Sequence, residues 1–204
     1  MASGGNVANS KNSALLLPNW FNDAAEYRLK KSLIWAACNM RARDGCTPLE
    51  SLDLLMTLLR ENDNCENPYA DDYSIAQVLT ALGQVSTTLD AGLLVSSIND
   101  AIAQARIWLD LDTLGVHPGR STKKTDTRTR SHNGVVSACA IQCLCQLELL
   151  RGGMPEVEYE AFTSRRHPTA VRIAAIQSMI QLFLAYDNGI HDGDPAEGLS
   201  CALL

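Results

Sequence analysis

Histidine and cysteine are the residues of this sequence with the greatest capacity for catalysis or metal binding. The four histidines, His117, His132, His167 and His191, all fall in predicted loops or in the C-terminal tail. The sequence has no H-E-x-x-H zinc motif, no G-x-S-x-G nucleophile turn, no P-loop and no G-x-G-x-x-G dinucleotide motif. We therefore predict a protein that is not an enzyme, with no catalytic residues and no cofactor.

Three of the seven cysteines, Cys139, Cys143 and Cys145, lie close together in one predicted helix. Cys139 and Cys143 are one helical turn apart, but Cys145 points to a different face. Structural zinc sites favour a C-x2-C pair followed by a second pair, so we expect core packing and no metal. The odd cysteine count and a start unlike a signal peptide indicate reduced thiols in the cytosol or nucleus.

A basic segment interrupts an acidic chain. The 204 residues include 17 Lys or Arg and 23 Asp or Glu, for a formal charge of −6. Between positions 120 and 130, however, five basic residues stand against one acid, Asp126. The segment could contact DNA phosphates or an acidic partner, and it could equally be a solvated connector whose hydroxyls accept phosphate. The five basic residues are Arg120, Lys123, Lys124, Arg128 and Arg130.

The last four residues, Cys201-Ala202-Leu203-Leu204, formally match a prenylation box. A stable lipid anchor usually needs upstream basic residues or a second lipid, and this tail is acidic. No uninterrupted apolar run approaches the roughly 18 residues that span a bilayer. We therefore expect no prenylation of Cys201 and no membrane partner.

The apolar residues recur at helical spacing, and no stretch alternates as a strand would. One helix start is especially clear, because Thr47-Pro48-Leu49-Glu50 reads as a capping box. We predict an all-α domain over residues 22–186 with a basic loop at 110–132, between a disordered lead-in (1–21) and a disordered tail (187–204). The seven predicted helices cover residues 23–43, 47–60, 72–83, 90–108, 134–151, 155–163 and 168–186.

Two helices begin with the same apolar-Arg-apolar step, Tyr27-Arg28-Leu29 and Val171-Arg172-Ile173. The arginines are separated by about three steps of 48 residues, close to the length of HEAT units. This spacing favours a right-handed α-solenoid of HEAT/ARM-like helix pairs over a closed bundle. Arg28 and Arg172 are then the candidates for stacking contacts between repeats.

Three stretches, in order, resemble the helical-repeat region of subunit 2 of the general transcription factor TFIID. They run from Glu26 to Pro48, from Leu58 to Tyr73 and from Arg130 to Ala175. The second is the most specific, because the family reads L-L-K-Y-N-D-N and then N-x-[FY]-[SD]-D-x-[FY]; Glu61 departs from the usual Tyr. Short Asn and Asp side chains can tie an inter-helix connector and cap the next helix, so we interpret this motif as a structural turn. Its positions are Asn62, Asp63, Asn64, Tyr69, Asp71 and Tyr73.

The resemblance implies a nuclear, non-enzymatic scaffold in RNA polymerase II pre-initiation complex assembly and in core-promoter recognition at the initiator. It implies partners among the other TFIID subunits, including the eighth associated factor, and promoter DNA as a further candidate partner. No small-molecule substrate is implied. The aminopeptidase-like front half of the family is absent from these residues, so we expect a fragment, a split gene product or a shortened form. Two alternatives stay open: the HEAT-like C-terminal domain of a gluzincin aminopeptidase, and a free-standing HEAT adaptor.

Overall fold

A computed structural model describes residues 22–62, 64, 69–86, 92–115, 130–152 and 155–187. Within these ranges every regular element is helical, which confirms the all-α prediction. The seventh predicted helix, at 155–163, is a short 3₁₀ turn in the structure. The elements are α1 (Ala24–Asn39), α2 (Leu49–Arg60), α3 (Asp72–Leu82), α4 (Gly92–Leu114), η1 (His132–Gly134), α5 (Val135–Arg151), η2 (Tyr159–Thr163) and α6 (Thr169–Asp187).

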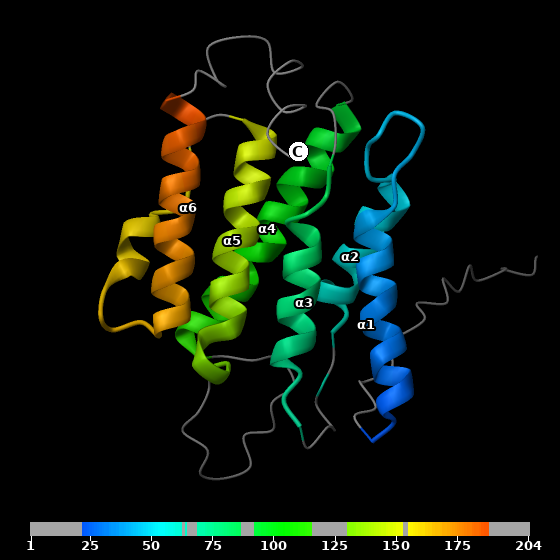
Figure 1. Cartoon of the computed structure of the whole chain (residues 1–204), viewed down its shortest axis with the longest axis horizontal. Helices are drawn as coiled ribbons and strands as arrows, with labels where there is room; N and C mark the ends of the chain where they lie inside the picture. The colour runs from blue at the N-terminus through cyan, green and yellow to red at the C-terminus, as the bar shows by residue number, and fades with distance from the viewer. Residues whose placement is uncertain are drawn as a thin grey trace, which may run out of the picture.

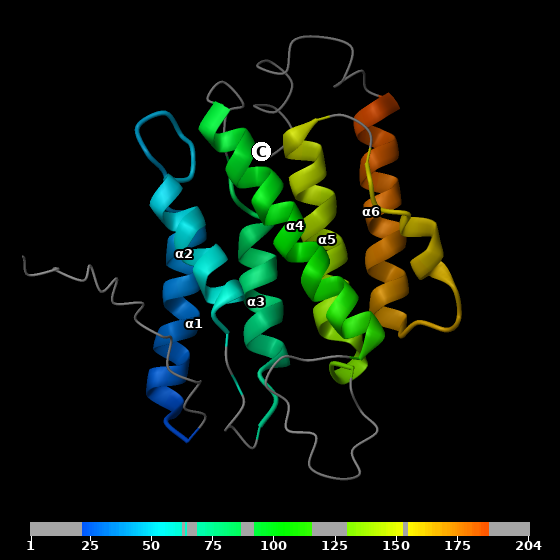
Figure 2. The same ribbon diagram turned by 180° about the vertical axis from the view of Figure 1, so that it is seen from behind.

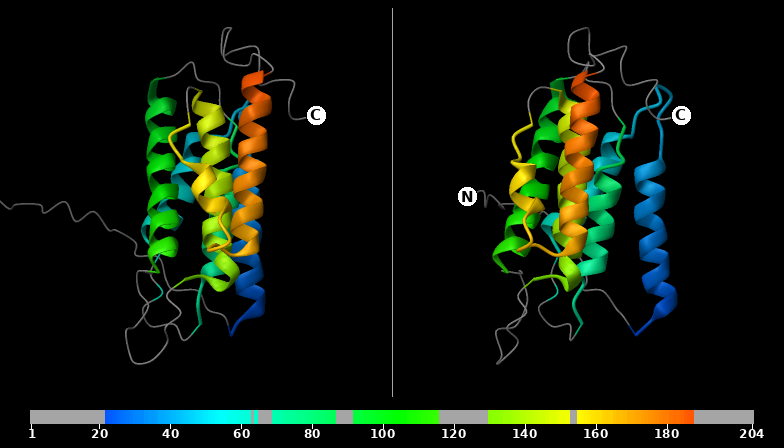
Figure 3. Two further views of the ribbon diagram at one scale, coloured as in Figure 1. Left: turned by 90° about the vertical axis from the view of Figure 1, so that its left-hand side faces the viewer. Right: turned by 60° about the vertical axis from the view of Figure 1, so that its left-hand side comes forward.

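The helices stand side by side in a row, with α1 at one end and α6 at the other (Figures 1 and 2). Seen along the row, α1, α3, α5 and α6 form one layer, and α2 and α4 pack against one side of it (Figure 3). Each helix therefore contacts its neighbours in the row and in the other layer. This is the architecture of a helical-repeat array, as predicted.

The core lies between α3, α4 and α5, the inner helices of the row. Leu79 of α3, Ile98 of α4 and Leu144 of α5 are each fully buried. Gly83, just after α3, allows a close approach, because a Cβ atom there would lie 3.1 Å from the Cα atom of Cys143. The two inner helices of the longer layer can thus pack backbone against backbone.

Two predicted helix ends were wrong. The first helix ends at Asn39 rather than Arg43, and the fourth continues to Leu114, so the connector after it begins later than position 110. The capping box at Thr47 was also wrong: Pro48 is the N-cap residue of α2, and no side-chain cap is present. Thr47 instead donates its N–H to the Ser86 carbonyl (2.6 Å) and accepts the Ser86 N–H at Oγ1 (2.9 Å). A tertiary contact that fixes the start of α2 to the chain after α3 has replaced the local cap.

Two helices among the described residues are long and apolar enough to cross a membrane by length and composition alone. They are His132–Arg151, which includes α5, and α6; the apolar windows of the two are 67% and 28% buried. The sequence expectation missed them because it required an uninterrupted apolar run, whereas a few scattered polar residues do not lower the average enough. The first is the central helix of the core, but α6 leaves most of its apolar surface uncovered.

Candidate interaction sites

A buried carboxylate holds both ends of the basic segment. Asp112, in the last turns of α4, is only 1% exposed. Its Oδ1 accepts the N–H of Ser131 (2.6 Å), and its Oδ2 accepts the Ser131 hydroxyl (2.8 Å). The same Oδ2 accepts the N–H of Ser137 (2.9 Å) and the Ser137 hydroxyl in the first turns of α5. Such charge-assisted bonds are among the stronger hydrogen bonds in proteins, so residues 112 and 131 are firmly joined.

The chain leaves and re-enters the array at this junction. Gly115 turns out of α4 with a φ of +74°, and its N–H donates to the Asp112 carbonyl (3.2 Å). On the return side, the N–H of His132 donates to Oδ2 of Asp72 at the start of α3 (3.2 Å). Arg130 is exposed beside this junction. The other four predicted basic residues, Arg120, Lys123, Lys124 and Arg128, lie outside the described residues.

The family-motif connector between α2 and α3 is tied by two side-chain amides. Nδ2 of Asn62 donates to Oδ2 of Asp71 (2.7 Å), and Nδ2 of Asn64 donates to the Tyr69 carbonyl (2.7 Å). Asp71 is buried, whereas Tyr69 and Tyr73 are more than half exposed. These bonds cross the connector from its first to its second half, which is the arrangement that a structural turn requires. Asp63 lies outside the described residues, and Asp71 makes no side-chain cap bond to α3.

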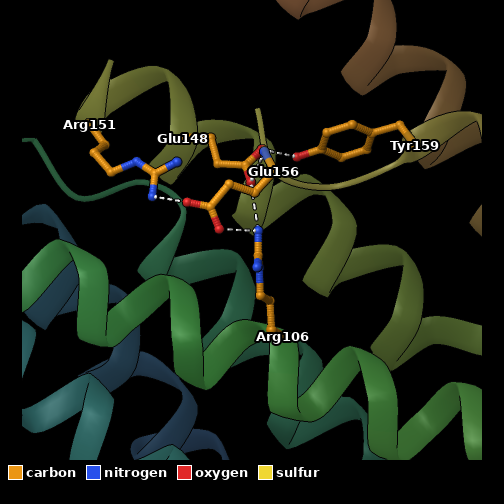
Figure 4. Close-up of polar contacts among 5 residues, drawn as sticks. All are labelled: Arg106, Glu148, Arg151, Glu156 and Tyr159. Carbon is orange, nitrogen blue, oxygen red and sulfur yellow. Dashed lines mark hydrogen bonds and ion pairs between the residues drawn. The ribbon is translucent and has the colours of Figure 1, made fainter. Parts of the chain in front are cut away.

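A second buried carboxylate joins α4, α5 and the connector before α6 (Figure 4). Glu148 of α5 is 2% exposed. It accepts the hydroxyl of Tyr159 (2.8 Å) and the N–H of Glu156 (3.1 Å), and its Oε1 lies 3.4 Å from Nη2 of Arg106. Arg106 also pairs with Glu156 at 2.9 Å, and Glu156 pairs with Arg151 at 2.7 Å. The cluster contains two arginines and two glutamates, so its formal charges cancel.

The electrostatic effects of this cluster are those of a structural clamp. Hydrogen bonding to Arg151, together with the charges of Arg106 and Arg151, lowers the pKa of Glu156 below its usual range. Burial, with the neighbouring Glu148 carboxylate, raises the pKa of the Tyr159 hydroxyl, which keeps it a hydrogen-bond donor. Every charged group that Figure 4 labels has an opposite charge beside it. The cluster therefore fastens the connector to α4 and α5.

The two arginines of the repeated step occupy different environments. Nε of Arg172 donates to the Thr163 carbonyl (3.2 Å), which holds η2 against the first turns of α6. Arg28 is exposed on α1, at the opposite end of the row. The stacking contact between repeats therefore stays a prediction for both residues.

Among the described residues, no three or more His, Cys, Asp or Glu side chains are grouped so as to hold a metal ion. Cys143 and Cys145 are buried in the core, and Cys139 is half-buried. Burial raises the pKa of Cys139 and Cys143, and it raises that of Cys145 to about 11. These thiols are thus protonated, apolar packing residues at neutral pH.

Sequence reasoning missed Asp112, Ser131, Ser137 and Glu148, although each carries a visible signal. Asp112 and Glu148 are single acids in predicted apolar helices, at positions that face the core. A buried acid must find donors, and the two serines flank the start of α5. That signal is weak without the fold, because periodicity does not reveal which neighbouring segment supplies the donors.

The row of helices, the buried clamps at its connectors and the basic segment define a helical-repeat protein that presents surfaces to partners. Comparison with known protein families makes the class specific. The family described as "TAF2-like, TPR repeats" matches residues 8–190, and the chain belongs to that family.

Two relatives carry the same name, "Transcription initiation factor TFIID subunit 2". The protein from Schizosaccharomyces pombe is 35% identical over 72 residues, which cover 35% of this chain and 6% of the relative. The protein from Danio rerio is 23% identical over 167 residues, which cover 79% of this chain and 13% of the relative. The chain thus corresponds to a small part of the length of these relatives.

Proposed function

We propose that the chain is a nuclear, non-enzymatic scaffold of TFIID that acts in assembly of the RNA polymerase II pre-initiation complex. The observation that carries the proposal is the family match, which extends over nearly the whole chain. The name of both relatives, a subunit of a transcription initiation factor, supports it. The fold supports it as well, because helical-repeat arrays form extended surfaces suited to protein partners.

The proposed partners are other TFIID subunits, the eighth associated factor among them. The test is affinity purification from nuclear extract with the full chain as bait, followed by quantitative mass spectrometry. Several named TFIID subunits should be enriched over a bait-free control. Circular dichroism first establishes that the bait is helical, so that the absence of all TFIID subunits from a folded bait would contradict the proposal.

Promoter recognition is assigned to the basic segment. Its ends are fixed by the buried carboxylate of Asp112, so cations between them enter the array at a defined place. Each Lys or Arg that neutralises a phosphate adds roughly 0.9 to the slope of log affinity against log salt concentration. Replacing Lys123, Lys124 and Arg128 with Ala should therefore weaken binding to an initiator duplex and lower that slope by roughly 3.

The matched control removes three exposed cations elsewhere, by replacing Arg43, Arg165 and Arg166 with Ala. Both triple variants change the net charge equally, so a general electrostatic effect would weaken both alike. Fluorescence anisotropy at several salt concentrations separates the two cases. Equal slopes for the two variants would contradict a phosphate contact by the basic segment.

A further inference from the structure

Helix α6 is apolar on two opposite sides. One side packs against α5 and includes Val171, Ala174, Ala175, Ser178 and Leu182, all buried. The opposite side is exposed to a degree unusual for large apolar residues. We call this second set the α6 stripe; its members are Ile173 (50% exposed), Ile176 (44%), Met179 (40%), Ile180 (54%), Phe183 (67%) and Leu184 (50%).

The α6 stripe carries no charge. From Ile173 to Tyr186 the sequence contains no Asp, Glu, Lys or Arg. The two glutamines of this stretch are held at its edge, where Gln177 bonds Gln142 (3.1 Å) and Gln181 bonds Gln146 (3.0 Å), both on α5. A helix that is apolar all round is normally buried all round, and terminal helices of repeat arrays normally present a polar outer side. The stripe therefore has the properties of a contact surface.

We propose that the α6 stripe binds a second copy of this chain, forming a two-fold dimer through antiparallel α6 helices. Ile176, Ile180 and Leu184 follow one another at intervals of four residues, which is the ridge that packs into the groove of a facing helix. In an antiparallel pair centred on Ile180, Ile176 of each copy meets Leu184 of the other. Because the stripe is uncharged, bringing two identical stripes together opposes no like charges.

The area is sufficient for a specific dimer. If each of the six side chains covers roughly 100 Å², two copies remove about 1,200 Å² from water, the lower limit for stable interfaces. The stripe runs along a straight helix that lies at the end of the row, so a second copy can approach without obstruction from the other helices (Figures 1 and 3). A two-fold pairing also uses up both stripes and stops at the dimer.

The exposed apolar side of α1 is the competing surface. Leu29, Leu33 and Met40 are 51–59% exposed there. Lys30 and Lys31 lie next to these residues in the sequence and are partly exposed, so two α1 helices would bring cations together. Pairing α6 of one copy with α1 of the next would leave a free end on each molecule and would grow into a filament. A closed dimer and an open filament are therefore distinguishable by mass alone.

The test is analytical ultracentrifugation of the full chain over a hundredfold range of concentration. The expected result is a monomer–dimer equilibrium with no larger species. Ile180→Glu should shift the equilibrium constant at least a hundredfold toward monomer, because the two-fold axis places the two carboxylates together. Leu33→Glu on α1 is the matched control and should leave the dimer constant unchanged.

A charge-swap experiment shows that a monomeric variant is still folded and that the axis is where we place it. Ile180→Glu and Ile180→Lys should each be monomeric alone, and an equal mixture should form a heterodimer. Any of four results would overturn the proposal: a monomer at all concentrations, a mass that rises without limit, a loss of association in Leu33→Glu only, or failure of the mixture to pair although both variants are helical. Binding of a monomeric chain to phosphatidylcholine vesicles would indicate a lipid surface in place of the second copy.

Discussion

Replacing Gly134 with Ala should destabilise the fold by more than replacing any glycine that has the same backbone conformation but open surroundings. Gly134 lies between η1 and α5 with a φ of +68°, in the left-handed region. An added Cβ would lie 2.6 Å from Cγ2 of Val171 and 3.1 Å from Cγ of Pro168. The left-handed conformation costs an L-residue about 1–2 kcal/mol, and forcing a methyl group into a packed contact costs about 1–3 kcal/mol more.

Gly45 provides the matched control, because its φ is +82° and its Cβ would meet nothing within 4 Å. Gly45→Ala therefore carries the backbone cost without the contact cost, and the effect of the methyl group on the unfolded chain is common to both variants. The difference between the two losses in free energy of unfolding should be about 1–3 kcal/mol. With a urea m-value of about 2 kcal/mol/M, the unfolding midpoints should differ by roughly 1 M.

Urea unfolding followed by circular dichroism at 222 nm measures both variants. The contact with Val171 can be tested directly, since Val171→Ala in the Gly134→Ala background should cost less than the sum of the two single substitutions. Equal losses for Gly134→Ala and Gly45→Ala, or additive effects in the double variant, would show that the start of α6 does not press on Gly134 as described.

Three further predictions concern the polar groups and thiols. Asp112→Asn should lower the free energy of unfolding by about 2–4 kcal/mol, because buried donors lose a charged acceptor, while Asp110→Asn, at an exposed position of the same helix, should change it by less than about 0.5 kcal/mol; similar effects in thermal melts would refute this. The folded-state pKa of Glu156 is lowered, chiefly by Arg151, so its contribution to stability is present above the ordinary glutamate pKa and is lost as pH falls through the folded value. Glu156→Gln should therefore lessen the loss of stability in acid, and an unchanged pH profile would contradict the pairing. Cys145, with a pKa raised to about 11, should resist iodoacetamide at pH 7.5 until the chain unfolds; peptide mass spectrometry that finds it labelled at the rate of a free thiol would refute its burial.

Sequence patterns predicted the helices well because each helix buries an apolar stripe of recognisable period. Their ends were less predictable, and Thr47 shows why. Its local sequence is an ideal cap, but the backbone of Ser86 offers it two hydrogen bonds from a segment 39 positions away. Local patterns cannot reveal a competitor that only the folded chain brings near.

The candidate sites divide in the same way. The connector at Asn62 and Asn64 was predictable, because its hydrogen bonds close within nine residues. The clamp at Asp112 joins residues 19 and 25 positions apart across the basic segment, so no short motif encodes it. Glu148 reaches back 42 positions to Arg106, and its partner depends on how α4 and α5 pack.

The bonds at Asp112 also make the array divisible. Since the chain between 115 and 130 is closed by contacts at its base, peptide-bond continuity there is not what holds α4 to α5. A specific protease site placed between these positions should yield two fragments, one with the first four helices and one with the last two, that stay together after cleavage. The same property makes this the natural place to join a reporter or an affinity tag, or to express the halves as separate chains and ask whether they find each other.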